Sequence, residues 1–412
     1  KTESSILANQ LTSRQMRILL IAAVLISAVS GIVALRSLVL DDLAMSHASL
    51  AATISEGNFP VKDPSSPGHL MNYHYGSDLL TASLYNVAYI PLWLGYDIQT
   101  IIFSGLIFLM AFLLAFEIIG RFRSAFLAAF LTLYGGGLIW LNFIHGISPL
   151  WHKYILHEQV IGPWAFIWEM VYMKFSPSLV LGMNNHSGAM GFPIMLGAIY
   201  CYFKIFNSEE KKLLAYAVMA GLFLGYSALS VETSFIIVLI AMVIFFIIKM
   251  ASLFLKKTNA DDIKRIGGHF LIVMSVAGLL ALFQGGVLTA AKSGVADAAS
   301  FGFNWRFWLI DLGRYGQGTI FEWEFLKELG LPVILFLSAV WFHRRNGRII
   351  FLALIAGGAF LAPLFVRFIP RPWEMMRLFG LFNALAFFVI GLFLGDLSLK
   401  LRQNHHQYRY LK

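Results

Sequence analysis

Two adjacent acids, Asp41 and Asp42, follow the first long apolar segment of the chain, residues 18–40. The stretch after them is polar and leaves no room for a second membrane span until about residue 100. Carboxylates at a membrane boundary are costly to place, and one that faces a pocket can act as a general base. We therefore predict Asp41 and Asp42 as catalytic residues. The alternative is that both acids cap the helix end and face water.

A second polar cluster lies further along this stretch. Residues 72–75 form an aromatic and polar turn, and we predict that His74 and Tyr75 bind the substrate. His74 and Asp78 are spaced i, i+4, so on a helix they would share one face. With Asp41 they would supply the His and carboxylate ligands of a divalent metal site. Hydrogen bonds to a sugar or to each other are the alternative, so a divalent metal is possible and no cofactor is certain.

Two further candidates lie where apolar segments begin. Glu232 stands in a tight turn between two apolar runs. It either faces the same pocket as Asp41 or serves to cap a helix. Asn185 precedes another apolar run, where its amide can hold sugar hydroxyls and a helix N-terminus favours a phosphate. Simple capping is again the alternative, and we predict both side chains as substrate-binding.

Arginines mark the last candidate, a short loop that contains Arg367, Arg371 and Arg377. On the predicted topology this loop is external, against the tendency of Lys and Arg to stay on the cytoplasmic side. A lipid phosphate is the natural partner, because a guanidinium group binds phosphate through two parallel hydrogen bonds. We predict that Arg371 and Arg377 bind the substrate. Pairing with Glu374 and with surface headgroups is the alternative.

The composition indicates which elements hold these residues. Of the 412 residues, 58% are hydrophobic and 13% are charged, whereas a soluble domain carries about 25% charged residues. Apolar runs of about 20 residues indicate membrane-spanning helices. The sequence therefore predicts an all-α polytopic membrane protein. The net charge of +9 does not indicate nucleic acid, because Lys and Arg gather in short loops and tails, where they fix topology and meet anionic lipids.

About ten apolar segments are predicted to span the membrane. A further apolar stretch, residues 79–95, is predicted to lie along the interface as a juxtamembrane helix, because counting it as a span would place Arg121 and Arg123 outside. Both termini are then cytoplasmic, and the protein is a multi-pass protein of the cell (plasma) membrane. The predicted spans are 17–40, 99–119, 124–144, 188–206, 212–229, 231–250, 268–288, 331–343, 349–368 and 376–396.

The chain is predicted to form a single transmembrane domain, residues 1–412, with long segments on the non-cytoplasmic side. The first external loop, 41–98, holds the juxtamembrane helices. Segments 145–187 and 289–330 are rich in Trp, Tyr and Phe. Aromatic rings favour the membrane–water interface, so we expect both segments to lie at the depth of the lipid headgroups.

Two features are predicted to be structural rather than functional. Glu117 is spaced i, i+4 from Arg121, which predicts an ion pair near a helix end. The run Gly135–Gly136–Gly137 predicts close helix packing. The sequence has no P-loop and no GxGxxG after a strand, so nucleotide-driven chemistry is not expected.

An ordered set of motifs lies between residues 17 and 123. The acidic pair follows the first span, a helix is expected to end in the turn 55–60 (SEGNFP), and a later span ends in Gly120–Arg121. This order resembles the first part of the GT-C superfamily of membrane glycosyltransferases. It is most similar to the branch of protein O-mannosyltransferases and aminoarabinose or undecaprenyl-linked sugar transferases. The second acid is Asp42 instead of Glu, and residues 74–77 replace a Pro-Pro start of the second interfacial helix, which leaves subfamily and acceptor open.

The resemblance implies a GT-C-like fold and a hexosyl or pentosyl transferase. Its donor would be a polyprenyl-phosphate-linked sugar, its acceptor a lipid, glycan or protein, and its general base Asp41. A basic residue such as Arg371 or Arg377 would contact the donor phosphate. Two other classes stay open: a non-catalytic GT-C-like subunit among other membrane subunits, and a transporter or flippase for a lipid-linked substrate. A transporter would need an inverted repeat and broken helices at mid-membrane, and the sequence shows neither.

Overall fold

The computed structural model shows a bundle of long helices with short strands between some of them. It describes residues 11–34, 47–64, 66–71, 73–136, 186–206, 212–257, 259–284, 286, 288–289, 301–311, 317–368 and 375–409. The polytopic membrane character expected from the composition is confirmed, because seven of the described helices are long and apolar enough to cross a membrane. These seven are α1 (Ser13–Ala34), α5 (Leu92–Ile119), α11 (Leu213–Ser230), α12 (Glu232–Leu255), α13 (Ala260–Phe283), α17 (Gly347–Phe365) and α18 (Met376–Arg409).

The other predicted spans also lie on helices. They correspond to α6 (Phe122–Tyr134), a shorter apolar helix, to α10 (His186–Lys204) and to α16 (Leu331–Phe342). A one-turn helix, α15 (Trp323–Phe325), and a π-helical stretch, η3 (Leu326–Gly330), lead directly into α16. The periodic apolar signal therefore located the helices well, whereas their ends shifted by several residues because capping and packing set them.

The interfacial helix predicted at residues 79–95 is wrong in its bounds. The structure has two helices there, α4 (Gly76–Ala88) and the start of α5 at Leu92. The break falls at Tyr89, which takes a left-handed conformation with φ 54°, and at Pro91, the N-cap of α5. A proline fits the start of a helix but not its interior. With 13 residues, α4 is too short to cross a membrane.

Two predicted turns are confirmed by their backbone. The short helix α3 (Ala48–Ser55) ends at the turn 55–60, where Gly57 has φ +95°, a conformation that costs glycine little. Helix α5 ends with Gly120 in the left-handed conformation, φ 67°, which is a common way to stop a helix. The first stop lies between α3 and the β1–β2 ribbon, and the second separates α5 from α6.

Short antiparallel ribbons, which the sequence did not predict, connect some helices. Strand β1 (Lys62–Asp63) pairs with β2 (Ser66–Leu70) between α3 and α4. Strand β3 (Phe301–Phe303) pairs with β6 (Val366–Phe368), which follows α17 directly, and β4 (Leu309–Asp311) pairs with β5 (Gln317–Thr319). The β3–β6 pairing ties part of the predicted segment 289–330 to the stretch just before α18. Aromatic rings of the segment 289–330, such as those of Trp305 and Trp323, are exposed.

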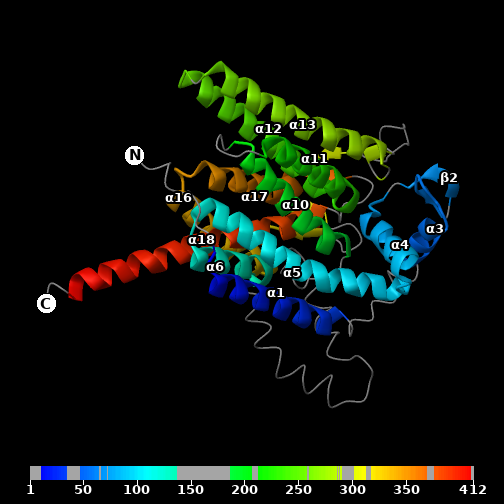
Figure 1. Ribbon diagram of the computed structural model, residues 1–412, viewed down its shortest axis with the longest axis horizontal. Coiled ribbons are helices and arrows are strands. Elements are labelled where there is room, and N and C mark those ends of the chain that lie inside the picture. Colours follow the sequence, from blue (N-terminus) through cyan, green and yellow to red (C-terminus); the bar gives the residue numbers. More distant parts are fainter. Residues whose placement is uncertain are drawn as a thin grey trace, which may run out of the picture.

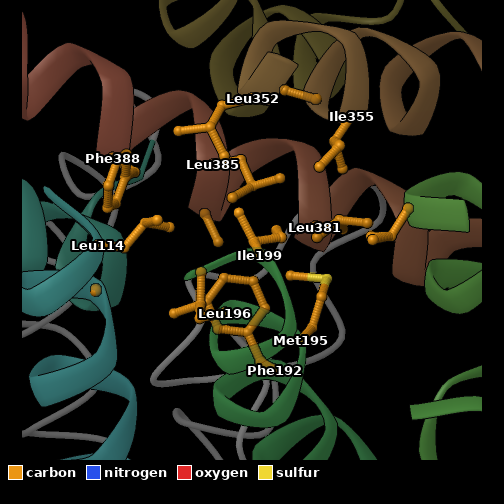
Figure 2. Packing of buried hydrophobic residues seen from close by; sticks show 14 of the residues in the cluster. Leu114, Phe192, Met195, Leu196, Ile199, Leu352, Ile355, Leu381, Leu385 and Phe388 are labelled. Carbon is orange, nitrogen blue, oxygen red and sulfur yellow. The ribbon is translucent and has the colours of Figure 1, made fainter. Parts of the chain in front are cut away.

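The centre of the bundle is apolar and is built around α10 and α18. Figure 2 shows side chains of α10, such as Leu196 and Ile199, pointing toward Leu381 and Leu385 of α18. Leu114 of α5 closes this core on one side. Each fully buried aliphatic side chain contributes roughly 1.5–3 kcal/mol to folding in water. In lipid that term is weaker, and close packing gains importance.

Close packing is tightest between α6 and α18. A Cβ atom on Gly391 would lie 2.5 Å from Ala128 Cα, and one on Gly395 would lie 2.6 Å from Ser124 Cα. The packing role predicted for the glycine run is confirmed at Gly135, where a Cβ atom would lie 2.2 Å from Phe387. Small residues thus let the two backbones approach, as is common in membrane helix pairs.

The bundle has two distinct ends (Figure 1). Helices α3 and α4 and strand β2 lie together at one end, and α18 extends beyond the bundle at the other. At that second end Glu117 pairs with Lys204 at 2.8 Å and with Arg348 at 3.2 Å. The predicted Glu117–Arg121 pair is wrong, because Arg121 starts a new helix beyond Gly120 and reaches Asp396 at 3.0 Å.

Candidate functional site

Four of the eight predicted site residues lie within the described parts of the chain. These are His74, Tyr75, Glu232 and Arg377. Asp41, Asp42, Asn185 and Arg371 lie outside the described residues, so their predicted roles stay predictions. The end of the bundle that carries α3 and α4 holds all four described residues.

Three of the four described residues come together from distant segments. His74 precedes α4, Glu232 is the first residue of α12, and Arg377 lies in the first turn of α18. His74 Nδ1 lies 3.6 Å from Glu232 Oε2, and Arg377 Nη1 lies 3.3 Å from His74 Nε2. His74 is only 2% exposed and Glu232 only 8%. The sequence separation between His74 and Arg377 is 303 residues, so only the fold brings them together.

The chemistry of the three side chains limits the state of the imidazole. A guanidinium group only donates hydrogen bonds, so the His74 nitrogen that meets Arg377 must carry a lone pair. Arg377 Nη1 lies at nearly equal distances from the two ring nitrogens, 3.4 Å from Nδ1 and 3.3 Å from Nε2, so a neutral ring can accept at either nitrogen. The trio then joins one cation and one anion through a neutral imidazole. Such a group can hold a phosphate at the guanidinium and sugar hydroxyls at the carboxylate and imidazole.

A second polar group, which the sequence reasoning missed, lies against this trio. His47 Nδ1 lies 2.9 Å from Asp78 Oδ1 and 3.2 Å from Asp78 Oδ2. The Tyr96 hydroxyl lies 2.6 Å from the same Asp78 Oδ1. The predicted sharing of a helix face by His74 and Asp78 is wrong, because α4 begins at Gly76 and His74 lies before it. His47 had no signal in the sequence beyond its place in the loop that follows Asp41 and Asp42.

Aromatic contacts connect the two groups. The His47 ring lies 6.1 Å from the His74 ring in a stacked arrangement and 5.7 Å from the Tyr73 ring. Tyr73 also lies against His74, with 3.7 Å between ring centroids. His47, His74, Asp78, Glu232 and Arg377, together with Tyr73 and Tyr96, therefore form one cluster, which we call the histidine cluster.

The fourth described residue, Tyr75, holds the loop rather than lining the cluster. Its side chain is fully buried and its hydroxyl donates to the Gln284 carbonyl just after α13. Burial, with a smaller effect of Tyr226, raises the pKa of Tyr75 far above its usual value, so the hydroxyl stays protonated and can donate. A direct substrate contact of Tyr75 stays a prediction.

Further buried hydrogen bonds fix the start of α4. The Tyr226 hydroxyl of α11 donates to the Gly76 carbonyl at 3.2 Å. Ser77 donates to Gln99 at 3.0 Å, and Gln99 donates to Thr81 at 2.6 Å, which joins α4 to α5. A Cβ atom at Gly76 would lie 2.7 Å from Ser230 Oγ and 2.9 Å from Met190 Cε, so the start of α4 packs closely against α10 and α11. The loop that carries His74 is thus anchored to α5, α11 and the end of α13.

The described part of the chain contains no set of ligands for the possible metal site. There, no three His, Cys, Asp or Glu side chains are grouped so that they could hold a metal ion. Asp41, the third ligand of the predicted site, lies outside these residues. His74 and Asp78 contact different partners, Glu232 and His47.

Comparison with known proteins supports the membrane assignment. Residues 8–168 match the model of a family described as "Uncharacterized membrane protein (DUF2298)". Neither the curated proteins nor the solved structures contain a match to this chain. The matched region contains Asp41, His47 and Asp78, whereas Glu232 and Arg377 lie beyond it. The protein is thus a multi-pass membrane protein.

Proposed function

We propose that the protein is a membrane glycosyltransferase that moves a sugar from a polyprenyl-phosphate donor to an acceptor on the external face. The observation that carries the proposal is the meeting of His74, Glu232 and Arg377 at one end of the bundle. A guanidinium beside a carboxylate and an imidazole suits a phospho-sugar, which presents one anionic group and several hydroxyls. The GT-C-like order of motifs in residues 17–123 supports the same reaction.

The N-terminal ends of helices add to this arrangement. Arg377 lies in the first turn of α18, and Glu232 in the first turn of α12. Helix N-termini carry partial positive charge and exposed backbone donors, so they favour a phosphate nearby. In our proposal Arg377 and Arg371 hold the donor phosphate, while His74, Glu232 and Asn185 contact the sugar.

The placement of charge supports an external site. Glu117 lies near the end of α5 that is far from α4, where it pairs with Lys204 and Arg348, and Arg121 just beyond that end pairs with Asp396. Basic residues favour the cytoplasmic side, so the histidine cluster would face outward and both termini would be cytoplasmic. A site at one end of the bundle also favours a transferase over a transporter, which binds its substrate near mid-membrane.

The proposed reaction inverts the configuration at the sugar. Asp41 removes the proton of the acceptor hydroxyl as the acceptor oxygen bonds to the anomeric carbon. The bond from that carbon to the phosphate oxygen breaks, and its electron pair leaves with the polyprenyl phosphate. Arg377 stabilises the charge that develops on this oxygen. Asp42 supports Asp41 or binds substrate.

An assay of the purified full chain in lipid nanodiscs tests this function. The donors are polyprenyl phosphates that carry different hexoses and pentoses, and the acceptors are a membrane extract. We expect transfer by the wild type and a loss of about 10²–10⁴-fold in Asp41→Asn, because a general base contributes about that much. Asp261→Asn is the matched control and should retain full activity. Asp261 lies in the first turn of α13, whereas Gln284 follows the last turn of the same helix.

Two results would contradict the proposal. Full activity in Asp41→Asn would remove Asp41 as the base. Absence of transfer, together with absence of polyprenyl phosphate binding by the wild type, would exclude this donor class. The second result would favour a non-catalytic subunit of a membrane complex.

A further inference from the structure

The His47–Asp78 pair has the geometry of a proton-transferring histidine and its positioning carboxylate. Asp78 is fully buried and lies within hydrogen-bond distance of His47 Nδ1 and of the Tyr96 hydroxyl. The Tyr96 hydroxyl also lies 3.0 Å from the His47 carbonyl oxygen, so it joins the backbone and the carboxylate of the pair. A carboxylate at Nδ1 holds the proton on that nitrogen and fixes the ring orientation. A proton transfer by this imidazole would use Nε2.

His47 lies next to the residue that contacts the proposed phosphate ligand. Its ring stacks 6.1 Å from the His74 ring, and His74 lies 3.3 Å from Arg377, the proposed phosphate ligand. Its side chain is 15% exposed, in contrast to Asp78 at 1%. The imidazole is thus the outer member of the pair, and it lies beside His74, which contacts Arg377.

We propose that His47 is the general acid of the transfer and that Asp78 positions it. This inference rests on the proposed function. As the bond between the sugar and the phosphate oxygen breaks, Nε2 of the His47 imidazolium gives its proton to that oxygen. The acceptor proton passes to Asp41, and after the reaction it returns to His47 through water, so charge and protons balance. Arg377 holds the phosphate while the proton arrives.

The charges around His47 favour the imidazolium form that this role needs. Asp78 of α4 contacts the ring directly, and Tyr96 of α5 stays neutral as a donor. Tyr73 and His74 face the ring from the loop before α4 and carry no charge in the state derived above. Glu232 of α12 and Arg377 of α18 carry opposite charges and both contact His74. The nearest full charge is the negative one of Asp78, which stabilises a positive ring.

Binding of polyprenyl phosphate, the leaving group, tests the inference without turnover. Its dissociation constant is measured between pH 5.5 and 8.5 for the full chain in zwitterionic nanodiscs. An imidazolium that faces the phosphate should tighten binding by roughly tenfold as pH falls through the ordinary range of histidine, near about 6.5. His47→Gln should lose this part of the pH dependence. The titration of the phosphate itself is common to both proteins, so their difference reports His47.

Two further variants keep the test sharp. Asp78→Asn retains the imidazole but removes the charge that favours its protonation, so the tightening should move to lower pH. It replaces His47→Gln if that variant fails to fold. His269→Gln, a histidine of α13 bonded to the Arg265 carbonyl, is the matched control. It lies about 22 Å along the helix from the end of α13 that meets Tyr75, and it should behave as the wild type.

The outcomes separate the inference from the function on which it rests. If the wild type binds polyprenyl phosphate with the help of Arg377, and His47→Gln keeps the wild-type pH dependence, the general acid is wrong and the transferase stands. If the wild type does not bind polyprenyl phosphate at any pH, the donor class and the inference both fail.

Discussion

The two ends of the helix bundle both contain buried or half-buried charges, but they use them differently. At one end Glu117 has two cationic partners, Lys204 and Arg348, and the contacts are 2.8 and 3.2 Å. At the other end His74 meets Glu232 at 3.6 Å and Arg377 at 3.3 Å, distances that are long for strong hydrogen bonds. The first end has the close pairing of a structural network. The second has longer contacts, and in our proposal it binds the donor.

The elements that carry the two groups differ as well. Glu117 lies in the last turn of α5, Lys204 is the last residue of α10, and Asp396 lies inside α18. His74 lies in a loop, and Glu232 and Arg377 lie in first turns of helices. Loops and helix starts expose backbone donors and can approach a substrate from several directions. The comparison therefore predicts that changes at the histidine cluster affect activity, whereas changes at the ion pairs affect stability.

The largest expected effect is on Arg377. Arg377→Gln removes the charge that holds the donor phosphate, and we expect sugar transfer to fall by about 10²–10³-fold with little change in thermal stability. Arg348→Gln is the matched control at the other end and should keep its transfer rate. Transfer assays and melting in detergent measure both. Equal losses of activity in the two variants would contradict the predicted functional difference between the two ends of the bundle.

The next effect concerns the packing that supports the ion-pair end. Gly395→Ala places a methyl group 2.6 Å from Ser124 Cα, so α6 and α18 must move apart. We expect a loss of about 1–3 kcal/mol in unfolding free energy. The control is Gly278→Ala on α13, where nothing lies within 4 Å of the new methyl group. A stable Gly395→Ala protein would mean that the two helices are not in such close contact.

The smallest effect is expected for Glu117. Glu117→Gln leaves Lys204 and Arg348 without their shared carboxylate, which should cost about 1–2 kcal/mol, because both cations are partly screened by water. Asp262→Asn removes a single exposed i, i+3 pair with Arg265 and should cost at most about 0.5 kcal/mol. Chemical denaturation in micelles compares them. An equal cost would show that the Glu117 network adds nothing beyond an ordinary surface pair.

Some residues of the candidate site could be predicted from the sequence and others could not. Glu232 and Arg377 stand out because charges are rare beside apolar runs, and His74 because it lies in an aromatic turn. His47 was not predicted, because it is recognised as a candidate only by its contact with Asp78, which lies 31 residues away in the sequence. Glu117 was assigned to the wrong partner because local spacing ignores α10 and α17, which supply Lys204 and Arg348.

The sequence by itself determined the class of the protein and the places of its helices. Runs of about 20 apolar residues have few other stable forms, since lipid requires every backbone hydrogen bond to be made within the helix. The tertiary structure alone decided which side chains meet. His74 and Arg377 are 303 residues apart in the sequence, and Glu232 lies between them. The distances between these three side chains depend on the packing of α4, α12 and α18. The hydropathy pattern indicates which residues lie in the membrane. Which side chains contact each other across the bundle depends on how the helices pack, and no local sequence pattern specifies that packing.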